Sequence, residues 1–203
     1  MKIIETRAAP NPRRVRIFLA EKGITVPFEE VDLMSGILKQ PAFGAKNPMQ
    51  RVPVLMLDDG TAIAETVAIC RYFEETQPEP ALFGTGAKGR ATVEMWNRRI
   101  EFGLLQAAAH ALRHLNPKMA HLEVPQVPAW GEANKPKAIA MLGILDAQLK
   151  SNRFMAGDGY SIADITAMVA VDFLKPARIT RPEALVHLER WYGEVSARPS
   201  AQA

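Results

Sequence analysis

The sequence predicts two domains: a small α/β domain with a mixed sheet, followed by a domain made only of helices. Residues 1–76 alternate short apolar runs with helical patterns in the order βαβαββα. Residues 77–87 are rich in proline and glycine, which is typical of a linker. Residues 88–203 then carry helical patterns, with apolar residues recurring every three or four positions.

The composition is that of a globular protein. Of the 203 residues, 48% are hydrophobic and 23% are charged, which excludes a disordered chain. The net charge of +3 comes from 25 basic and 22 acidic residues, and the basic residues are scattered. Their densest group, Arg13, Arg14 and Arg16, has no aromatic residues between its members. We interpret it as a solvated helix face and expect no nucleic-acid partner.

Cysteine content and hydropathy predict the compartment. Cys70 is the single cysteine, which excludes an internal disulfide and fits a reducing environment. The first apolar run is too short for a signal peptide, and no apolar stretch reaches the roughly 18 residues that span a bilayer. We therefore expect a cytoplasmic enzyme or binding protein with no membrane partner.

The N-terminal domain begins with a predicted strand at Lys2–Glu5 and a helix that starts at Asn11 and Pro12. Asn11 would be the N-cap, and Pro12 would be the first helical residue, where its missing N–H does no harm. A second strand is expected over 26–33, followed by a loop with a weak helix over 35–45.

A hairpin and a helix complete this domain. Pro53 opens the first strand of the hairpin, where a missing N–H costs little. Asp59-Gly60 between two apolar runs predicts a two-residue turn, because glycine tolerates a positive φ. Glu65 and Thr66 then begin a helix whose free backbone N–H groups could bind an anion. The stretch therefore predicts a compact site for a small ligand.

Helical periodicity in the second domain predicts four helices, over 87–115, 138–149, 161–173 and 183–195. Between the first two, four prolines keep the chain largely irregular. The third helix starts at a capping box formed by Ser161 and Asp164.

Together these motifs resemble the glutathione transferase family along nearly the whole chain. The resemblance rests on Val52-Pro53 before the Asp59-Gly60 hairpin, on Glu65-Thr66-Val67-Ala68-Ile69 at a helix start, and on Phe-Met-Ala-Gly-Asp-Gly-Tyr-Ser-Ile-Ala-Asp-Ile over 154–165. The sequence is most similar to the atypical yeast and bacterial branch, typified by the second yeast glutathione transferase. The resemblance implies a thioredoxin-like N-terminal domain, an all-helical C-terminal domain and a homodimer.

The resemblance places glutathione, as a co-substrate, on the N-terminal domain. Val52 would pair its backbone with the cysteinyl part like an added strand, and Pro53 would be cis. Glu65 would accept from the γ-glutamyl ammonium, and Thr66 would hold the α-carboxylate. The alternative is that Glu65 is only a first-turn acidic residue and Thr66 an ordinary cap.

The glycyl carboxylate of glutathione needs a positively charged or amide partner. The resemblance gives this role to Lys39, and otherwise to Gln40 or Arg51. The alternative for Lys39 is a solvated surface lysine. The resemblance implies no metal ion.

The residue that activates the thiol departs from the family pattern. Most members place a Tyr, Ser or Cys near the first helix, and these positions fall near Glu5 or Thr6, on Ala9 and on Asn11. Asn11 could donate an amide N–H to the thiolate beside the helix N-terminus, or it could serve only as an N-cap. Cys70 stands at an apolar helix position, which predicts a core residue and not a nucleophile.

A second group of candidates lies on the helical domain. In the resembled branch, a water held by helical-domain side chains takes the thiol proton, and Ala109 stands here where that branch has a serine. His110 and His114 share one helix face and could hold such a water, line the electrophile pocket, or be exposed or at an interface. Arg113 could supply positive charge near the thiolate. Two histidines without a suitably spaced carboxylate seldom bind zinc.

We therefore predict a cytoplasmic glutathione transferase with a role in detoxification. It would bind glutathione, lower the pKa of the thiol and let the thiolate attack a small electrophile. Two alternatives stay open, a glutathione-dependent disulfide or peroxide reductase and a non-catalytic interaction module with the same fold. The missing Tyr, Ser or Cys leaves room for both.

Overall fold

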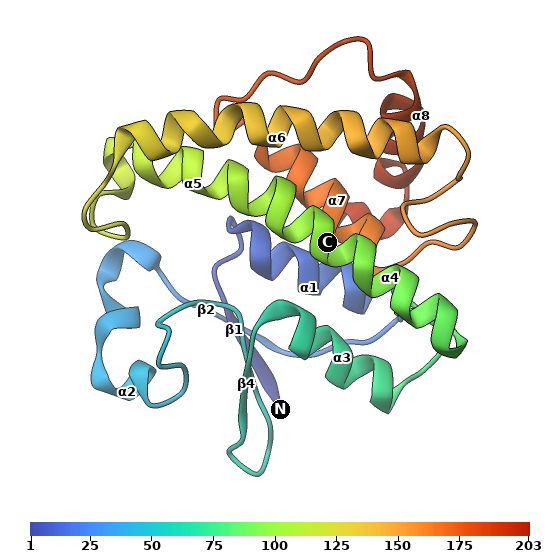
Figure 1. Cartoon of the computed structure of the whole chain (residues 1–203). Helices are drawn as coiled ribbons and strands as arrows, with labels where there is room; N and C mark the ends of the chain where they lie inside the picture. The colour runs from blue at the N-terminus through green and yellow to red at the C-terminus, as the bar shows by residue number, and fades with distance from the viewer. The chain divides into compact units, whose positions relative to one another are not determined.

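The computed structural model describes residues 1–203, which form two compact units. The first unit comprises Met1–Ala81 and Gln202–Ala203, and the second comprises Leu82–Ala201 (Figure 1). The first contains a four-stranded sheet with helices, and the second contains only helical elements. The predicted fold class, a thioredoxin-like domain of order βαβαββα followed by an all-helical domain, is confirmed.

The sheet of the first unit has the strand order β2-β1-β3-β4, with β1 over Lys2–Glu5, β2 over Phe28–Glu30, β3 over Val54–Met56 and β4 over Ala62–Ala64. The strands β1 and β2 are parallel, because helix α1 (Pro10–Glu21) crosses over between them. The pairs β1–β3 and β3–β4 are antiparallel. Edge strand β2 is shorter than the predicted 26–33, since only three of its residues pair with β1.

Three short helical turns connect β2 to β3, where the sequence predicts a loop with a weak helix over 35–45. They are η1 (Leu33–Ser35), η2 (Ile37–Lys39) and α2 (Pro41–Gly44). Leu38 and Phe43 from this segment are buried in one cluster with Ile4 and Val54 of the sheet. This apolar cluster fixes the connection to one face of the sheet.

Helix α1 begins two residues earlier than predicted. Ala9 is its N-cap, because the Ala9 carbonyl accepts the N–H of Arg13 at 3.3 Å, and Pro10 takes the first helical position. Asn11 therefore lies inside the first turn and does not cap the helix, which corrects the prediction.

The prediction that the α1 arginines form a solvated face is wrong for two of them. Arg14 is 2% exposed and Arg16 is 7% exposed. Arg16 Nη1 forms an ion pair with Glu5 Oε2 at 2.6 Å, and its Nη2 donates to the Arg7 carbonyl at 2.8 Å. A buried guanidinium is tolerated when protein groups replace its water in this way.

A buried lysine holds the other end of α1 to α3 (Thr66–Thr76). The Nζ atom of Lys22 lies 2.7 Å from Glu74 Oε2. It also donates to the carbonyls of Gln77, Pro78 and Pro80, at 2.7, 3.3 and 2.9 Å. The ammonium therefore satisfies carbonyls at and beyond the C-terminus of α3, where a positive charge is favourable.

The β3–β4 hairpin has a three-residue connection instead of the predicted two-residue turn. The Leu57 N–H donates to the Thr61 carbonyl at 2.9 Å, which leaves Asp58, Asp59 and Gly60 as the loop. Gly60 has a φ of +89°, and the Asp59 carboxylate accepts the Thr61 N–H at 2.8 Å. A left-handed glycine at the end of the loop is typical of three-residue hairpins.

The second unit contains five α-helices, α4 (Gly86–Ile100), α5 (Gln106–Leu115), α6 (Pro128–Leu149), α7 (Ile162–Phe173) and α8 (Val186–Ser196), with 3₁₀ turns at η4 (Pro117–Met119) and η5 (Pro199–Gln202). The predicted helix over 87–115 is interrupted, because Glu101–Leu105 form a π-helical turn, η3, between α4 and α5. Periodicity alone does not reveal such a turn, since it inserts one residue without ending the helix.

Helix α6 starts at Pro128, and not at residue 138 as predicted. Pro128 takes the first helical position, and Pro136 stands inside the helix, where tertiary packing outweighs its breaking tendency. Helices α5 and α6 lie side by side (Figure 1). Their contact requires Gly131, because a Cβ there would lie 2.6 Å from Cγ of Leu115.

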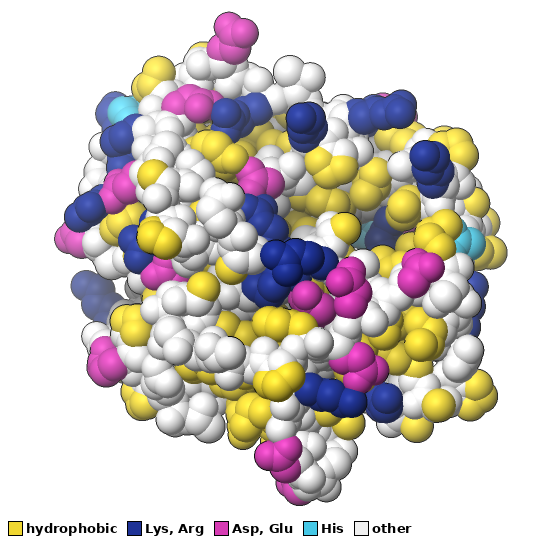
Figure 2. All heavy atoms as spheres, turned by 180° about the vertical axis from the view of Figure 1, so that it is seen from behind, with side chains coloured by type: hydrophobic (Ala, Val, Ile, Leu, Met, Phe, Trp, Pro, Cys, Tyr) yellow, Lys and Arg dark blue, Asp and Glu magenta, His cyan; other side chains and the backbone are white.

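None of the helices combines the length and the hydropathy needed to cross a bilayer. Basic side chains stand at separate places on the face shown in Figure 2, with acidic side chains between them.

Helix α7 is almost wholly buried, and Asp164 at its start is the polar centre of the second unit. The Asp164 carboxylate accepts the backbone N–H and the hydroxyl of Ser161 at 3.0 Å each, so the predicted capping box is present. It also accepts the Met155 N–H and the indole N–H of Trp191 from α8, both at 2.9 Å. Burial raises the pKa of the Asp164 carboxyl to about 6, and the four donors oppose that rise.

We expect Asp164→Asn to destabilise the protein by about 2–4 kcal/mol, because a neutral amide keeps one acceptor oxygen and turns an NH₂ group toward donors. Urea denaturation measures the change. Asp158→Asn, at an exposed position in the same loop, is the matched control and should stay within about 0.5 kcal/mol of the parent. Equal stabilities of the two variants would contradict the role of Asp164.

Candidate functional site

Strand register brings three chain segments to one edge of the sheet. Val54 pairs with Ile4 on one side and with Ala64 on the other. Glu5, Pro53 and Glu65 are therefore neighbours just beyond the paired strands. Helix α1 follows the first of these residues and α3 follows the last, and the two helices lie side by side (Figure 1). Two helix N-termini and the backbone before β3 thus meet at this edge.

The backbone of Val52 is an unused hydrogen-bonding edge. The Val52-Pro53 peptide is cis, as the resemblance implies. Neither the N–H nor the carbonyl of Val52 is hydrogen-bonded within the chain. The preceding loop is held by buried Asn47, whose amide donates to the Arg51 carbonyl at 2.8 Å and whose oxygen accepts the Met49 N–H at 3.0 Å. An extended ligand could pair with Val52 as an added strand.

Glu65 stands in a strained conformation at the start of α3. Its φ is +67° and its ψ is +119°, and a non-glycine residue in a sparsely populated region of this kind costs about 1–3 kcal/mol. Its side chain is exposed and makes no capping hydrogen bond. The carboxylate is therefore directed to solvent at the edge of the sheet, where it can accept from a cationic ligand group.

Thr66, the first residue of α3, is buried, and its hydroxyl accepts an N–H from Arg14 of α1. This contact places a guanidinium beside the N-terminus of α3. The free N–H groups of the first turn and the added positive charge both favour an anion. Sequence reasoning missed Arg14, although its position four residues before buried Phe18 puts it on the same helix face.

Asn11 offers donors at the start of α1. Pro10 and Pro12 have no N–H, so Asn11 carries the one free backbone N–H among the first three helical residues. Its side chain is exposed and forms no hydrogen bond within the chain. Because Asn11 is not the N-cap, its side-chain amide remains available to a ligand.

The other family positions for a thiol-activating residue hold no available hydroxyl. The Thr6 hydroxyl donates to the Val31 carbonyl at 2.6 Å. Glu5 is buried and paired with Arg16, and Ala9 has no functional group. Asn11 is therefore the candidate that the first unit provides.

The candidates for the glycyl carboxylate lie on two segments. Lys39 ends η2 and Gln40 is the N-cap of α2, whereas Arg51 directly precedes Val52. All three side chains are exposed.

On α5, the rings of His110 and His114 are stacked with centroids 6.0 Å apart. His114 is buried, its Nδ1 accepts the Val127 N–H at 3.0 Å, and its Nε2 lies 3.8 Å from a Glu123 oxygen. Arg113 pairs with the same Glu123 at 3.4 Å. Both side chains are therefore engaged in anchoring the segment before α6.

His110 differs from these two residues. Its Nδ1 is buried without a hydrogen-bond partner, and the ring of Trp130 packs edge-on against it at 5.8 Å. Burial, followed by the charge of the adjacent His114, lowers the pKa of His110 and favours its neutral form. Among the three α5 candidates, His110 is the one with a ring nitrogen that has no hydrogen-bond partner.

Cys70 is fully buried in α3, as predicted for a core residue, and burial raises the pKa of its thiol to about 12. It is therefore no nucleophile at neutral pH. The structure contains no cluster of three or more His, Cys, Asp or Glu side chains that could hold a metal ion.

The fold and the site define a thioredoxin-like domain with an unpaired backbone edge at Val52, joined in one chain to a helical domain. Residues 3–81 match the family model of the glutathione S-transferase N-terminal domain, and residues 125–199 match that of the C-terminal domain. The chain belongs to the glutathione S-transferase family.

Individual relatives place it within the family. Glutathione S-transferase 2 of Saccharomyces cerevisiae is 37% identical over 205 residues, covering 100% of this chain and 88% of the relative. The crystal structure of Gtt2 from the same yeast superposes with a TM-score of 0.95 at 36% identity, covering 100% of this chain and 99% of that chain. A glutathione S-transferase domain-containing protein from Marinobacter aquaeolei gives 0.93 at 43% identity, covering 98% and 99%. The predicted similarity to the yeast and bacterial branch is confirmed.

One similar protein is named an elongation factor and not a transferase. Elongation factor 1-gamma 2 of Oryza sativa is 27% identical over 94% of this chain and 44% of that protein. Membership of the family therefore does not by itself fix the activity.

The backbone strain at Glu65 can be measured through its effect on the free energy of unfolding. We expect Glu65→Gly to be more stable than Glu65→Ala by about 1 kcal/mol, because both remove the carboxylate and only alanine keeps a Cβ that opposes a positive φ. Urea denaturation gives both values. At the exposed helical position Ala68 the order should reverse, with Ala68→Gly destabilising by about 1 kcal/mol. A preference for alanine at both positions would contradict the strain.

Proposed function

We propose that this chain is a glutathione transferase that binds glutathione at the open edge of its first unit and directs the thiolate to a small electrophile. The observation that supports this most is the combination of an unused Val52 backbone and an exposed, strained Glu65 at the start of α3. Val52 would pair with the cysteinyl residue, and Glu65 would accept from the γ-glutamyl ammonium.

The two carboxylates of glutathione would bind at different places. The α-carboxylate would lie at the N-terminus of α3, against the Thr66 N–H and hydroxyl, with the charge of Arg14 behind it. The glycyl carboxylate would meet Lys39, or else Gln40 or Arg51, which the structure leaves exposed. Neither interaction requires a metal ion.

We infer that the first turn of α1 lowers the pKa of the thiol. A helix N-terminus favours a thiolate, and Asn11 adds a backbone N–H and an amide N–H there. The reaction then needs no covalent intermediate on the protein, because proximity and a stabilised thiolate are sufficient. From the second unit, His110 is the proposed water-holding residue, since His114 and Arg113 are already engaged by Val127 and Glu123.

We further propose a cytoplasmic homodimer with a role in detoxification. Met95 and Phe102, seven residues apart along the α4–η3 path, are apolar and exposed, which fits a surface that another copy covers. The relatives that are named glutathione S-transferases support the transferase activity, and the role in detoxification is our inference from that activity.

Two other functions remain as alternatives. A glutathione-dependent disulfide or peroxide reductase is favoured by the lack of a free Tyr, Ser or Cys, because a second glutathione could supply the resolving thiol. A non-catalytic module is favoured by the same lack and by the elongation-factor relative. Turnover of a halo-nitroarene, compared with turnover of hydroxyethyl disulfide, separates the two enzymes, and a module would bind no glutathione.

We expect Glu65→Gln to weaken glutathione binding by about 10- to 100-fold, since it keeps shape and backbone but loses a charge-assisted hydrogen bond. Isothermal titration calorimetry measures the affinity. Glu75→Gln, at an exposed position near the end of α3, is the control and should bind like the parent. Unchanged affinity in Glu65→Gln would remove Glu65 from the site, and no binding by the parent would overturn the proposed function.

Asn11→Asp should raise the pKa of the bound glutathione thiol by about one unit, because a carboxylate beside the thiolate disfavours its charge. Asn11→Ala should raise this pKa less, since it removes the amide donor but adds no negative charge. Ultraviolet absorbance of the thiolate against pH reports this pKa in the binary complex. A pKa that is the same in the parent and both variants would show that Asn11 does not act on the thiol.

A further inference from the structure

The loop before Val52 carries a residue in a backbone conformation that glycine normally adopts. Gln50 has a φ of +53°, in the left-handed region, and its side chain is exposed. A Cβ disfavours this conformation, and residues that adopt it in spite of a Cβ are concentrated at functional positions. Gln50 therefore keeps its amide side chain against a backbone preference for glycine.

Buried Asn47 imposes this conformation on the chain. The Asn47 carbonyl accepts the Gln50 N–H at 2.9 Å, and the Asn47 amide donates to the Arg51 carbonyl at 2.8 Å. The side-chain oxygen of Asn47 accepts the Met49 N–H at 3.0 Å, and its backbone N–H donates to the carbonyl of buried Phe43 at 2.9 Å. Because the residues on both sides of Gln50 bond to one buried side chain, the turn is fixed by the chain itself.

The side chain of Gln50 takes no part in holding this turn. The turn uses the backbone N–H of Gln50, whereas its side-chain amide forms no hydrogen bond within the chain. A glutamine amide carries two N–H donors and one acceptor oxygen. Gln50 thus presents available donors two residues before the unpaired backbone of Val52.

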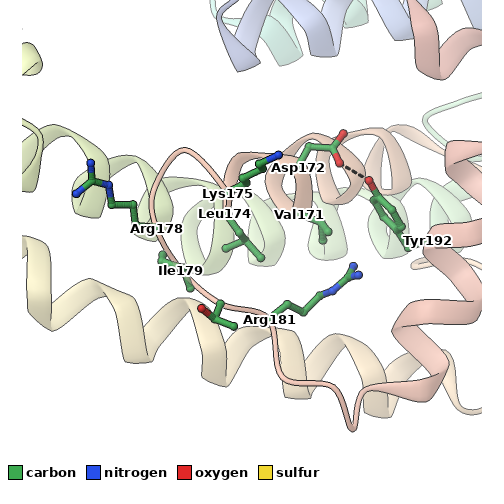
Figure 3. A pocket seen from close by; sticks show the side chains of 9 residues that line it. Val171, Asp172, Leu174, Lys175, Arg178, Ile179, Arg181 and Tyr192 are labelled. Atoms are coloured by element: carbon green, nitrogen blue, oxygen red, sulfur yellow. Dashed lines mark hydrogen bonds between the residues drawn. The ribbon is translucent and has the colours of Figure 1, made fainter.

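A left-handed backbone does not by itself define a ligand site. Arg178 in the second unit has a φ of +55°, but in Figure 3 its side chain extends away from the other labelled residues, which line the hollow between α7, the segment 174–181 and α8. Gln50 differs because it stands in the same loop as a backbone edge that lacks a partner. The strain and this position together point to a ligand.

Strand register decides which end of glutathione would reach Gln50. Val54 pairs with Ala64, so Glu65 is the neighbour of Pro53, on the C-terminal side of Val52. With the γ-glutamyl group at Glu65, the glycyl end runs the other way along the chain, as in an antiparallel pair.

The length of one residue then places the glycyl carboxylate. A residue in an extended strand spans about 3.4 Å. A glycine that follows a cysteinyl residue paired with Val52 therefore lies opposite Arg51. Its terminal carboxylate reaches the position opposite Gln50.

We propose that Gln50 is a specificity-determining residue whose amide donates a hydrogen bond to the glycyl carboxylate of glutathione. This role rests on the proposed function, because Val52 and Glu65 set the position of the ligand. The turn around Asn47 fixes the backbone of Gln50, so that only side-chain torsions are ordered on binding. A donor at this position favours a thiol peptide with a free carboxylate end over one whose end is blocked.

Isothermal titration calorimetry of the full chain with glutathione and with its glycyl ethyl ester tests this role. Gln50→Gly should weaken glutathione binding by about fivefold and ester binding by less than about twofold, because the ester offers no charged acceptor. Glycine adopts the left-handed backbone freely, so the urea midpoint of this variant should not fall below that of the parent. Lost affinity then cannot result from a lost fold.

Gln50→Glu reverses the interaction and keeps the length of the side chain. Its carboxylate would repel the glycyl carboxylate, so this variant should weaken glutathione binding by about tenfold or more and ester binding much less. Met49→Ala, at a residue of the same turn that is 67% exposed, is the matched control and should bind both compounds like the parent.

Failure of this role and failure of the proposed function are distinguishable. A parent chain that does not bind glutathione would overturn the proposed function and the role of Gln50 with it. If the parent binds glutathione and either Gln50 variant weakens glutathione and the ester by the same factor, or weakens neither, the role of Gln50 alone is overturned.

Discussion

The hydrogen bond from Arg14 to Thr66 joins the two helices whose N-termini lie at the proposed glutathione site. At the opposite ends of the same helices, Lys22 pairs with Glu74. Helices α1 and α3 are therefore clamped at both ends by buried cations. Each cation is tolerated only because protein oxygens replace its water, so neither clamp can form until both helices are in place. This arrangement gives the site two fixed helix starts beside the free backbone of Val52.

Both units contain a residue whose backbone would suit glycine but whose side chain is charged. These residues are Glu65, before α3, and Arg178, after α7. Strain of this kind persists only where the surrounding structure holds it, and it is often found at functional positions. In both cases the side chain is exposed and has no partner within the chain. At Glu65, the carboxylate held in this way is the group proposed to accept from the ammonium of glutathione.

The proposed binding of glutathione and the proposed activation of its thiol rest on different structural features. The residues proposed to bind glutathione are brought together by strand register, which fixes Pro53 beside Glu65. Two candidates for activating the thiol, Thr6 and Glu5, are unavailable, because they are engaged in structural contacts with Val31 and Arg16. Asn11 remains, and its position between two prolines concentrates the available donors of the helix start on one residue. The chemistry proposed for this chain therefore relies on the amide donors of Asn11 and not on a hydroxyl or a thiol.

The sequence by itself determined the order of strands and helices, the capping box at Ser161 and Asp164, and the edge that carries Val52, Glu65 and Thr66. These features depend on residues close together in the chain, whose spacing and backbone preferences act locally. Tertiary structure alone decided that Arg14 and Arg16 are buried, that α6 starts at Pro128, and that His114 is engaged while His110 is not. A buried charge, a tolerated proline and an occupied histidine each depend on a partner distant in sequence. The i/i+4 spacing with Phe18 places Arg14 on the inner face of α1, but only Thr66, 52 residues later, supplies the oxygen that accepts its hydrogen bond there.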